Sequence, residues 1–178
     1  MLVGVVGPSG AGKDTLMDGA RAALAGDTGF VFARRVITRP GGAGGEDHQP
    51  ATAAEFARMR DQGHFALWWD AHGLSYGIPA SILAEAGQGR VVVANLSRGV
   101  LAEAAARFPL LVLEITAPLE LRAARLAARG RESVEDVARR LSREAPLPQG
   151  LDIRRVVNDG SPDQGIAAVV AVLRGAMA

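Results

Sequence analysis

Short apolar runs alternate along the chain with longer segments in which apolar residues recur at helical spacing. Apolar runs at 2–6 and 91–94, and a mostly apolar one at 110–115, have the length of strands buried on both faces of a sheet. Two further strands are predicted at 30–37 and 153–157. Helices are predicted at 13–24, 52–62, 79–86, 102–107, 118–129, 133–143 and 163–177.

This alternation of strands and helices predicts an α/β fold, in which helices cover both faces of a parallel sheet. We expect a single domain over residues 1–178, which is an ordinary domain length. The stretch at about 39–79 breaks the alternation, with a glycine-rich loop at 41–45 and a region at 63–76 that suits short antiparallel strands. We interpret this stretch as an insertion over the ligand-binding edge of the sheet.

Composition narrows the class of protein. The net charge is +1 and cysteine is absent, which excludes thiolate metal sites and gives no support for a protein that coats nucleic acid or an anionic membrane. No run approaches the roughly 20 apolar residues that span a bilayer, and no secretory signal precedes the first strand, so we expect a cytoplasmic protein. Lys13 is the only lysine among 20 basic residues, which suggests that its position needs a compact ammonium.

The lysine belongs to a glycine-rich motif between the first strand and the first helix. Its residues are Gly7, Pro8, Ser9, Gly10, Ala11, Gly12, Lys13 and Asp14. The spacing fits the phosphate-binding loop, whose backbone N–H groups surround a phosphate at a helix N-terminus while the lysine reaches the outer phosphates. A dinucleotide fingerprint fits less well, because Thr15 stands where it needs glycine or alanine. We therefore expect these residues to bind a nucleoside triphosphate.

The last position of the motif departs from the usual pattern, which has a serine or threonine that binds Mg²⁺. Here it is Asp14, whose negative charge beside phosphates is favourable only if a cation lies between them. The strand at 91–94 is followed by Asn95, where such a strand often carries aspartate. We expect Mg²⁺, with Asp14 restoring the missing carboxylate ligand. An Asp14 that caps the helix or faces solvent is the alternative.

Three arginines form a stripe on the helix predicted at 118–129. Arg122, Arg125 and Arg129 are three and four residues apart, so they share one helix face. Such a cluster can stabilise charge on a transferring phosphoryl group. An ordinary solvated helix face is the alternative.

Further motifs resemble, in the same order, those of the guanylate kinase superfamily. After the phosphate loop these are Thr38-Arg39-Pro40, Glu55-Phe56, Tyr76-Gly77, Arg125-Leu126, Arg129-Gly130, Arg140-Leu141 and Asn158-Asp159. The resemblance covers nearly the whole chain. It implies a P-loop kinase with a parallel-sheet core, an acceptor-binding insertion and an arginine-bearing lid at about 129–133.

Guanylate kinases themselves fit less well, because Leu67 stands where that family has a glutamate that reads guanine. The chain resembles instead the ribose 1,5-bisphosphate phosphokinase family of phosphonate utilisation. The similar motifs are the phosphate loop with its aspartate, Ile37-Thr38-Arg39, Gly45-Glu46-x-His48, Gly73-Leu74-x-Tyr76-Gly77, Asn95-x-Ser97-Arg98, Arg129-Gly130-Arg131-Glu132 and Asn158-Asp159-Gly160. The resemblance implies transfer of phosphate from ATP, with Mg²⁺, to ribose 1,5-bisphosphate, which yields 5-phosphoribosyl 1-diphosphate.

The resemblance also implies roles for individual residues. The residues implied in catalysis are Lys13, Asp14, Arg125, Arg129 and Arg140, and Asn158 is expected near adenine. The residues implied for the acceptor are Arg39, Tyr76 and Arg98 for its phosphates, Asn95 and Ser97 for sugar hydroxyls, and Glu46 and His48. Trp68 and Trp69 are adjacent, so in a strand one faces inward and the other outward. We expect core packing, with the acceptor pocket as the alternative.

Two other functions remain open at this point. One is a nucleoside monophosphate kinase, and the other is a guanylate-kinase-like module that binds peptides without catalysis. The intact loop with Lys13 argues against the module, because such modules tend to lose it. We expect small-molecule partners, neither nucleic acid nor a membrane, and leave a homodimer open.

Overall fold

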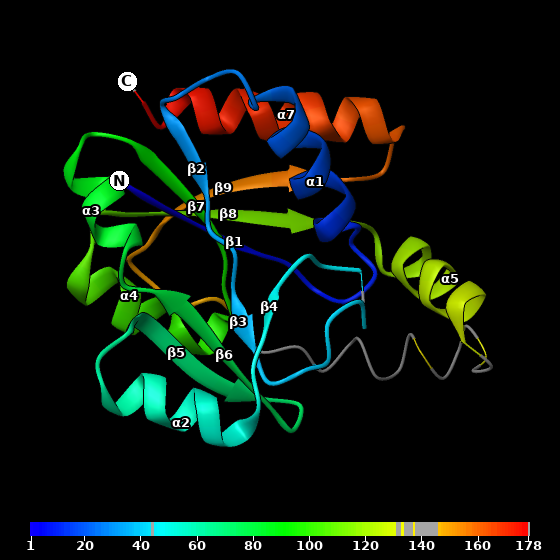
Figure 1. Ribbon diagram of the computed structural model, residues 1–178. Coiled ribbons are helices and arrows are strands. Elements are labelled where there is room, and N and C mark those ends of the chain that lie inside the picture. Colours follow the sequence, from blue (N-terminus) through cyan, green and yellow to red (C-terminus); the bar gives the residue numbers. More distant parts are fainter. Residues whose placement is uncertain (44, 131–132, 134–136, 138–145, 178) are drawn as a thin grey trace.

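The computed structural model describes residues 1–43, 45–130, 133, 137 and 146–177 (Figure 1). Its strands are β1 (Leu2–Val6), β2 (Phe30–Phe32), β3 (Val36–Ile37), β4 (Gln49–Pro50), β5 (Phe65–Ala71), β6 (Leu74–Pro79), β7 (Val91–Asn95), β8 (Leu110–Thr116) and β9 (Asp152–Val157). Its helices are α1 (Lys13–Ala23), α2 (Ala53–Asp61), α3 (Ile82–Gly87), the 3₁₀ turn η1 (Arg98–Val100), α4 (Leu101–Arg107), α5 (Leu119–Arg129) and α7 (Pro162–Gly175). Arg140, most of the helix predicted at 133–143 and part of the expected lid lie outside the described residues.

Five strands form a parallel sheet in the order β2-β7-β1-β8-β9, so the predicted α/β class is confirmed. β1 is its central strand, and Val3 pairs with Val93 of β7 on one side and with Leu111 of β8 on the other. The chain fills the β7 side of β1 before it crosses to the β8 side, so the strand order reverses at β1. Open α/β sheets bind ligands at the carboxyl ends of strands at such a point, which here is the end of β1.

Both faces of this sheet are covered, because successive residues of a strand point to opposite faces. Val5 and Leu113 pack on one face against α1 and α7, through residues such as Leu16. Val92 and Val112 pack on the other face against α4. Figure 1 shows α1 and α7 side by side above the sheet and α4 below it. These buried strands account for the apolar runs in the sequence.

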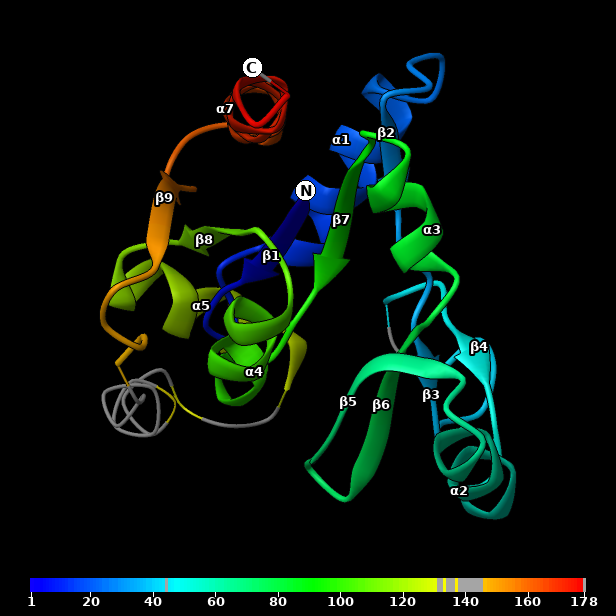
Figure 2. The same cartoon turned by 90° about the vertical axis from the view of Figure 1, so that its left-hand side faces the viewer.

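A second sheet, of order β4-β3-β6-β5, lies with α2 at the opposite end of the molecule from α7 (Figure 2). β5 and β6 are antiparallel, as predicted. Thr52 and Glu55 form a capping box at the start of α2, also as predicted. Phe56 of α2 stacks on Phe65 of β5 with 4.6 Å between ring centroids, which attaches the helix to this sheet.

Two predicted elements were wrong in their bounds. The strand predicted at 30–37 is two short strands in different sheets, since β2 pairs with β7 whereas β3 pairs with β4 and β6. Between them the side chain of Arg35 turns inward to Glu46. The helix predicted from residue 79 begins at Ile82, because Pro79 still pairs with Phe65 at the end of β6.

The last helix, α7, begins with a second capping box. Ser161 accepts a hydrogen bond from the N–H of Gln164, whose side chain accepts one from the N–H of Ser161. Pro162 occupies the first turn, where its missing N–H costs nothing. Among the helices of the described residues, none combines the length and the apolar character needed to cross a membrane.

Candidate functional site

The phosphate loop joins the end of β1 to the start of α1, at the point where the strand order reverses. Gly10 and Gly12 have φ angles of 80° and 81°, in the left-handed region that favours glycine. Gly12 directly precedes α1, so the unpaired N–H groups of the first helical turn add to those of the loop. A cavity of about 250 Å³, called the loop cavity below, is lined by Gly7, Pro8, Ser9, Gly10, Gly12, Lys13, Asp14, Thr15 and Arg129.

Two side chains expected at the nucleotide instead hold the carbonyl groups of the loop. Arg125 donates hydrogen bonds to the carbonyl oxygens of Gly10 at 3.3 Å, Ala11 at 3.4 Å and Asn158 at 3.1 Å. Nδ2 of Asn158 donates to the carbonyl oxygen of Ala11 at 2.8 Å. Because these carbonyls are held, the loop keeps a conformation that leaves its N–H groups for an anion. Direct contacts of Arg125 and Asn158 with ATP stay predictions.

Glycine is also required in the loop by close packing. A Cβ atom on Gly12 would lie 2.5 Å from Nδ2 of Asn158, and one on Gly10 would lie 2.7 Å from the carbonyl oxygen of Arg122. Real Cβ contacts are longer than this, so the backbone of α5 and the amide of Asn158 exclude any larger residue from both positions.

The three stripe arginines of α5 have different surroundings. Arg122 is buried, and Arg125 is bound to loop carbonyls. Arg129 is exposed and lines the loop cavity beside Asp14. The stripe is therefore neither an ordinary solvated face nor a set of three equivalent phosphate ligands, and Arg129 is the member that lines the cavity.

Lys13 lies between the loop and the end of β7. Its Nζ atom donates a hydrogen bond to Oδ1 of Asn95 at 2.7 Å and lies 3.6 Å from Oδ1 of Asp14. Burial lowers the pKa of Lys13 from its ordinary value, and the positive charge of nearby Arg35 lowers it further. The negative charge of Asp14 raises the pKa but does not cancel the effect of burial. An anion beside Nζ would favour the charged form again. Asn95, expected at sugar hydroxyls, is 6% exposed and uses its amide oxygen to hold Lys13.

Asp14 is suited to share a magnesium ion with phosphate groups. Its side chain is 51% exposed and lines the loop cavity next to Thr15. Mg²⁺ commonly takes one or two carboxylates and completes its octahedron with substrate phosphates and water. Within the described part of the chain there is no group of three or more histidine, aspartate or glutamate side chains that could hold a metal. The donor set thus fits an ion held mainly by phosphates.

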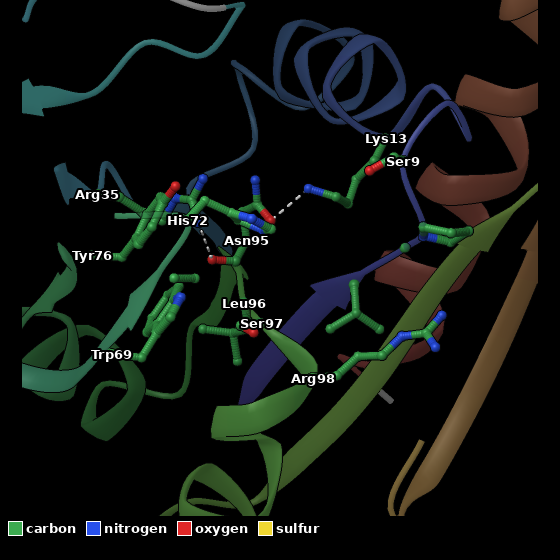
Figure 3. A pocket seen from close by; sticks show the side chains of 14 residues that line it. Ser9, Lys13, Arg35, Trp69, His72, Tyr76, Asn95, Leu96, Ser97 and Arg98 are labelled. Carbon is green, nitrogen blue, oxygen red and sulfur yellow. Dashed lines mark hydrogen bonds between the residues drawn. The ribbon is translucent and has the colours of Figure 1, made fainter. Parts of the chain in front are cut away.

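A second cavity, of about 430 Å³, adjoins the loop cavity and is called the acceptor cavity below (Figure 3). The two cavities share Gly7, Pro8, Ser9 and Lys13. The remaining residues that line it are Val6, Arg35, Trp69, Ala71, His72, Tyr76, Asn95, Leu96, Ser97 and Arg98. Two cavities that meet at one lysine suit a reaction in which two bound substrates exchange a phosphoryl group.

One wall of the acceptor cavity comes from the second sheet. Trp69 and Tyr76, paired across β5 and β6, stack with 5.5 Å between ring centroids and 6° between planes. The guanidinium of Arg35 lies 4.9 Å from the ring centroid of Tyr76 and is bound through Nε to Glu46 at 2.7 Å. The two tryptophans face opposite ways, as expected: Trp69 packs against the core cluster of Leu67 and Ile78 and also lines the cavity, whereas Trp68 is 40% exposed. Side chains in strands alternate between the two faces, so the neighbours separate.

Arg98 and Ser97 form the opposite wall, after the end of β7. Nη2 of Arg98 lies 3.5 Å from Oε1 of Glu114, a buried carboxylate on β8. Glu114 also accepts a hydrogen bond from Nε of Arg155 at 2.7 Å. The side chain of Ser97 accepts a hydrogen bond from the N–H of Gly99 and so caps the start of η1. Figure 3 shows Arg98 across the cavity from Arg35 and Tyr76.

Three residues expected at the acceptor, Arg39, Glu46 and His48, lie outside both cavities. His48 is 3% exposed, and its ring nitrogens lie 3.0 Å from the carbonyl oxygens of Glu46 and Arg39. Nη2 of Arg39 lies 3.4 Å from Nδ1 of His48. None of the three is among the residues that line the two described cavities. In this conformation Arg39 and His48 close the loop between β3 and β4, and contact of the three residues with an acceptor stays a prediction.

Comparison with known proteins places the chain among kinases. No family model matches it. A ribose 1,5-bisphosphate phosphokinase from Rhizobium etli is 47% identical over 180 residues, which cover 100% of this chain and 91% of that protein. One from Agrobacterium fabrum is 46% identical over 175 residues, which cover 97% and 96% of the two chains. The chain belongs to the ribose 1,5-bisphosphate phosphokinase family.

Some members of the ribose 1,5-bisphosphate phosphokinase family are longer. A bifunctional ribose 1,5-bisphosphokinase-thymidine phosphorylase from Cupriavidus necator is 55% identical over 172 residues, which are 96% of this chain but 28% of that protein. The present chain thus spans a little over a quarter of such relatives. A guanylate kinase structure from Anaplasma phagocytophilum has a TM-score of 0.71 at 17% identity, over 99% of this chain and 85% of that one. The guanylate-kinase-like fold is confirmed.

The structure also locates Leu67, which the resemblance matched to a glutamate of guanylate kinases. Leu67 is 1% exposed and packs with Ile78 and Val92 in the core, outside the acceptor cavity. Leu67 therefore makes an apolar core contact and offers no hydrogen-bonding group to the acceptor cavity.

Sequence reasoning missed three residues of the site. Arg35 looked like part of a strand, His72 had no supporting motif, and Glu114 looked like one polar residue in a buried strand. The structure places Arg35 and His72 in the acceptor cavity and Glu114 beneath Arg98. Glu114 carried one usable signal, because a carboxylate in an otherwise apolar strand needs a cationic partner.

Proposed function

We propose that the chain transfers the γ-phosphoryl group of ATP to ribose 1,5-bisphosphate, which yields ADP and 5-phosphoribosyl 1-diphosphate. The observation that carries the proposal is the meeting of the loop cavity and a cation-lined acceptor cavity at Lys13. Arginine and lysine around a small cavity suit a compact sugar with two phosphates, because such groups make charge-assisted hydrogen bonds. Relatives that carry the name ribose 1,5-bisphosphate phosphokinase support the same choice.

In the proposed reaction, an oxygen of the acceptor's 1-phosphate attacks the γ-phosphorus of ATP. The bond between the γ-phosphorus and the bridging oxygen breaks, and that oxygen leaves with ADP. The attacking phosphate is already anionic, so the protein needs no general base and contributes positioning and charge neutralisation. The loop N–H groups would bind the donor phosphates, while Lys13 lies at the junction where the transferred group must pass.

Magnesium would neutralise charge on the donor phosphates and is proposed to bind at Asp14. We expect Asp14→Ser to raise the Mg²⁺ concentration for half-maximal activity about tenfold, since a ligand changes from anionic to neutral. The measurement is a magnesium titration at saturating ATP. A half-maximal concentration equal to that of the unmodified protein would favour the alternative in which Asp14 only faces solvent.

The proposed function is tested by the choice of acceptor. The protein is incubated with ATP, Mg²⁺ and, in parallel, ribose 1,5-bisphosphate, ribose 5-phosphate or GMP, with the products identified by mass spectrometry. We expect 5-phosphoribosyl 1-diphosphate with ribose 1,5-bisphosphate, in a molar amount equal to ADP. Lys13→Ala serves as the inactive control. GDP as the main product would contradict the proposal in favour of a nucleoside monophosphate kinase.

A further inference from the structure

Arg35 is a buried cation in the wall of the acceptor cavity, and no sequence motif assigned it a role. It is 8% exposed. Its Nε and Nη2 atoms bind the two carboxylate oxygens of Glu46, and Nη1 donates to the carbonyl oxygen of Asn95 at 3.4 Å. The ring centroids of Tyr76 and Trp69 lie 4.9 Å and 5.8 Å from its guanidinium carbon. The side chain is therefore fixed by contacts on several sides.

The strand register places Arg35 at the edge of β6, in line with Leu67 of β5. Leu67 of β5 pairs with Ile78 of β6. Val36 of β3 pairs with Gly77, the residue before Ile78, in an antiparallel register. Arg35 directly precedes Val36, so it comes next to Ile78 from the other side. A buried cation thus lies in line with Leu67, the residue that the resemblance matched to a glutamate of guanylate kinases.

The contacts of Arg35 leave donors for a ligand. Each terminal nitrogen of a guanidinium carries two N–H groups, and the bonds to Glu46 and Asn95 use one on each. The nearby carboxylate of Glu46 cancels much of the charge of Arg35 at long range. The attraction between Arg35 and a ligand must therefore come from short-ranged, directional hydrogen bonds, as in phosphate contacts by arginine.

We propose that Arg35, oriented by Glu46, is a specificity-determining residue that binds the second phosphate of the acceptor, the one that does not react. This proposal rests on the proposed function. The reacting 1-phosphate lies toward Lys13, and the 5-phosphate lies toward Arg35, beside Trp69 and Tyr76. The same contact selects a bisphosphorylated sugar and excludes an acceptor that carries a base at that end.

The test compares two acceptors that differ by one phosphate. Dissociation constants of ribose 1,5-bisphosphate and ribose 1-phosphate are measured by calorimetry with Mg²⁺ and ADP present, for the unmodified protein and for Arg35→Met. We expect Arg35→Met to weaken binding of the bisphosphate about 10- to 100-fold, the size of one or two charged hydrogen bonds. Binding of ribose 1-phosphate should change less than about threefold, because it lacks the contacting group.

Arg34→Met is the matched control, because the adjacent Arg34 is exposed and pairs with Asp47 outside the cavity. It should leave both dissociation constants unchanged. Since Arg35→Met leaves Glu46 without its partner, the double variant Arg35→Met, Glu46→Gln is measured as well and should show the same acceptor dependence. Thermal melting verifies that each variant is folded.

The outcomes separate this inference from the proposed function. If the unmodified protein does not bind ribose 1,5-bisphosphate, the proposed function itself fails. If it binds, but both Arg35 variants weaken the two acceptors by the same factor or by none, Arg35 has only a structural role and this inference is overturned. A loss confined to the bisphosphate supports it.

Discussion

The two cavities that meet at Lys13 are built in different ways. The loop cavity is formed mostly by backbone, and its supporting side chains, Arg125 and Asn158, bind loop carbonyls from outside. The acceptor cavity is formed largely by side chains from separate elements, among them Arg35 and Trp69. Backbone recognition of phosphate tolerates little change in sequence, whereas a wall of side chains can be altered residue by residue.

Lys13 belongs to both cavities, so its removal should have the largest effect. We expect Lys13→Ala to lower kcat about 10³-fold, because one preorganised cation on a transferring phosphoryl group contributes on that scale. Lys13→Arg should rescue little, since a planar fork does not replace a compact ammonium. Steady-state rates with ADP detection provide the measurement. Near-normal activity in Lys13→Arg would show that charge alone suffices.

The lowered pKa of Lys13 also predicts a pH dependence. The charged form is the one that neutralises phosphate, so the affinity for ATP should begin to fall, as pH rises, below the ordinary lysine value of 10.5. Burial disfavours the protonated lysine in the folded state, so this group's contribution to stability increases as pH rises through the lowered pKa. ATP titrations across pH, with Lys13→Met as the reference without an ammonium, check the first effect.

A backbone-built donor site should be sensitive to a single Cβ atom. Gly12→Ala and Gly42→Ala both place alanine at positive φ, 81° and 76°, but only at Gly12 does the new Cβ meet another residue. We expect each to lose about 1–2 kcal/mol of stability from the backbone conformation. Gly12→Ala alone should weaken ATP binding, about 10²-fold or more. Equal ATP affinities in the two variants would show that ATP binding does not depend on the close packing of the backbone at Gly12.

Substitutions in the wall of the acceptor cavity should change the KM for the acceptor and leave the KM for ATP unchanged. We expect Trp69→Ala to raise the KM for ribose 1,5-bisphosphate about tenfold, through lost packing beside Arg35 and Tyr76. The KM for ATP should not change. Trp68→Ala is a control of the same chemistry, because Trp68 is exposed and lies under Arg60 instead. If Trp68→Ala raised the acceptor KM as much, the effect would reflect the stability of the sheet rather than the cavity.

The smallest expected effects concern the two capping boxes, one in each part of the molecule. Thr52→Ala and Ser161→Ala should each cost about 1 kcal/mol, with little change in kcat. Hydrogen bonds from Thr52 lower the pKa of Glu55. The contribution of this carboxylate to stability is therefore present above the ordinary pKa of glutamate and is lost as pH falls through the lowered pKa. The α7 box uses the neutral Gln164 and should not vary. Thermal melts at pH 7 and at acidic pH distinguish the two.

The apolar pattern and a contiguous motif determined the core and the donor site. Strands such as β1 and β7 are buried on both faces, so their residues are apolar throughout and their limits can be recognised from sequence. The phosphate loop needs only local chain geometry, which its glycines and Lys13 specify. The resemblance also indicated, at Leu67, that one feature of guanine recognition is missing, and this stays a prediction.

Tertiary structure decided the acceptor wall and the roles of the supporting residues. Arg35 lies between two short strands of different sheets, and only the crossing of the chain there turns it toward Glu46 and Tyr76. Arg125 and Asn158 are far apart in sequence from the loop carbonyls that they bind. Local periodicity specifies which face of an element is buried. It carries no information on which distant backbone atom a polar side chain meets, because that depends on how the sheets and helices pack together.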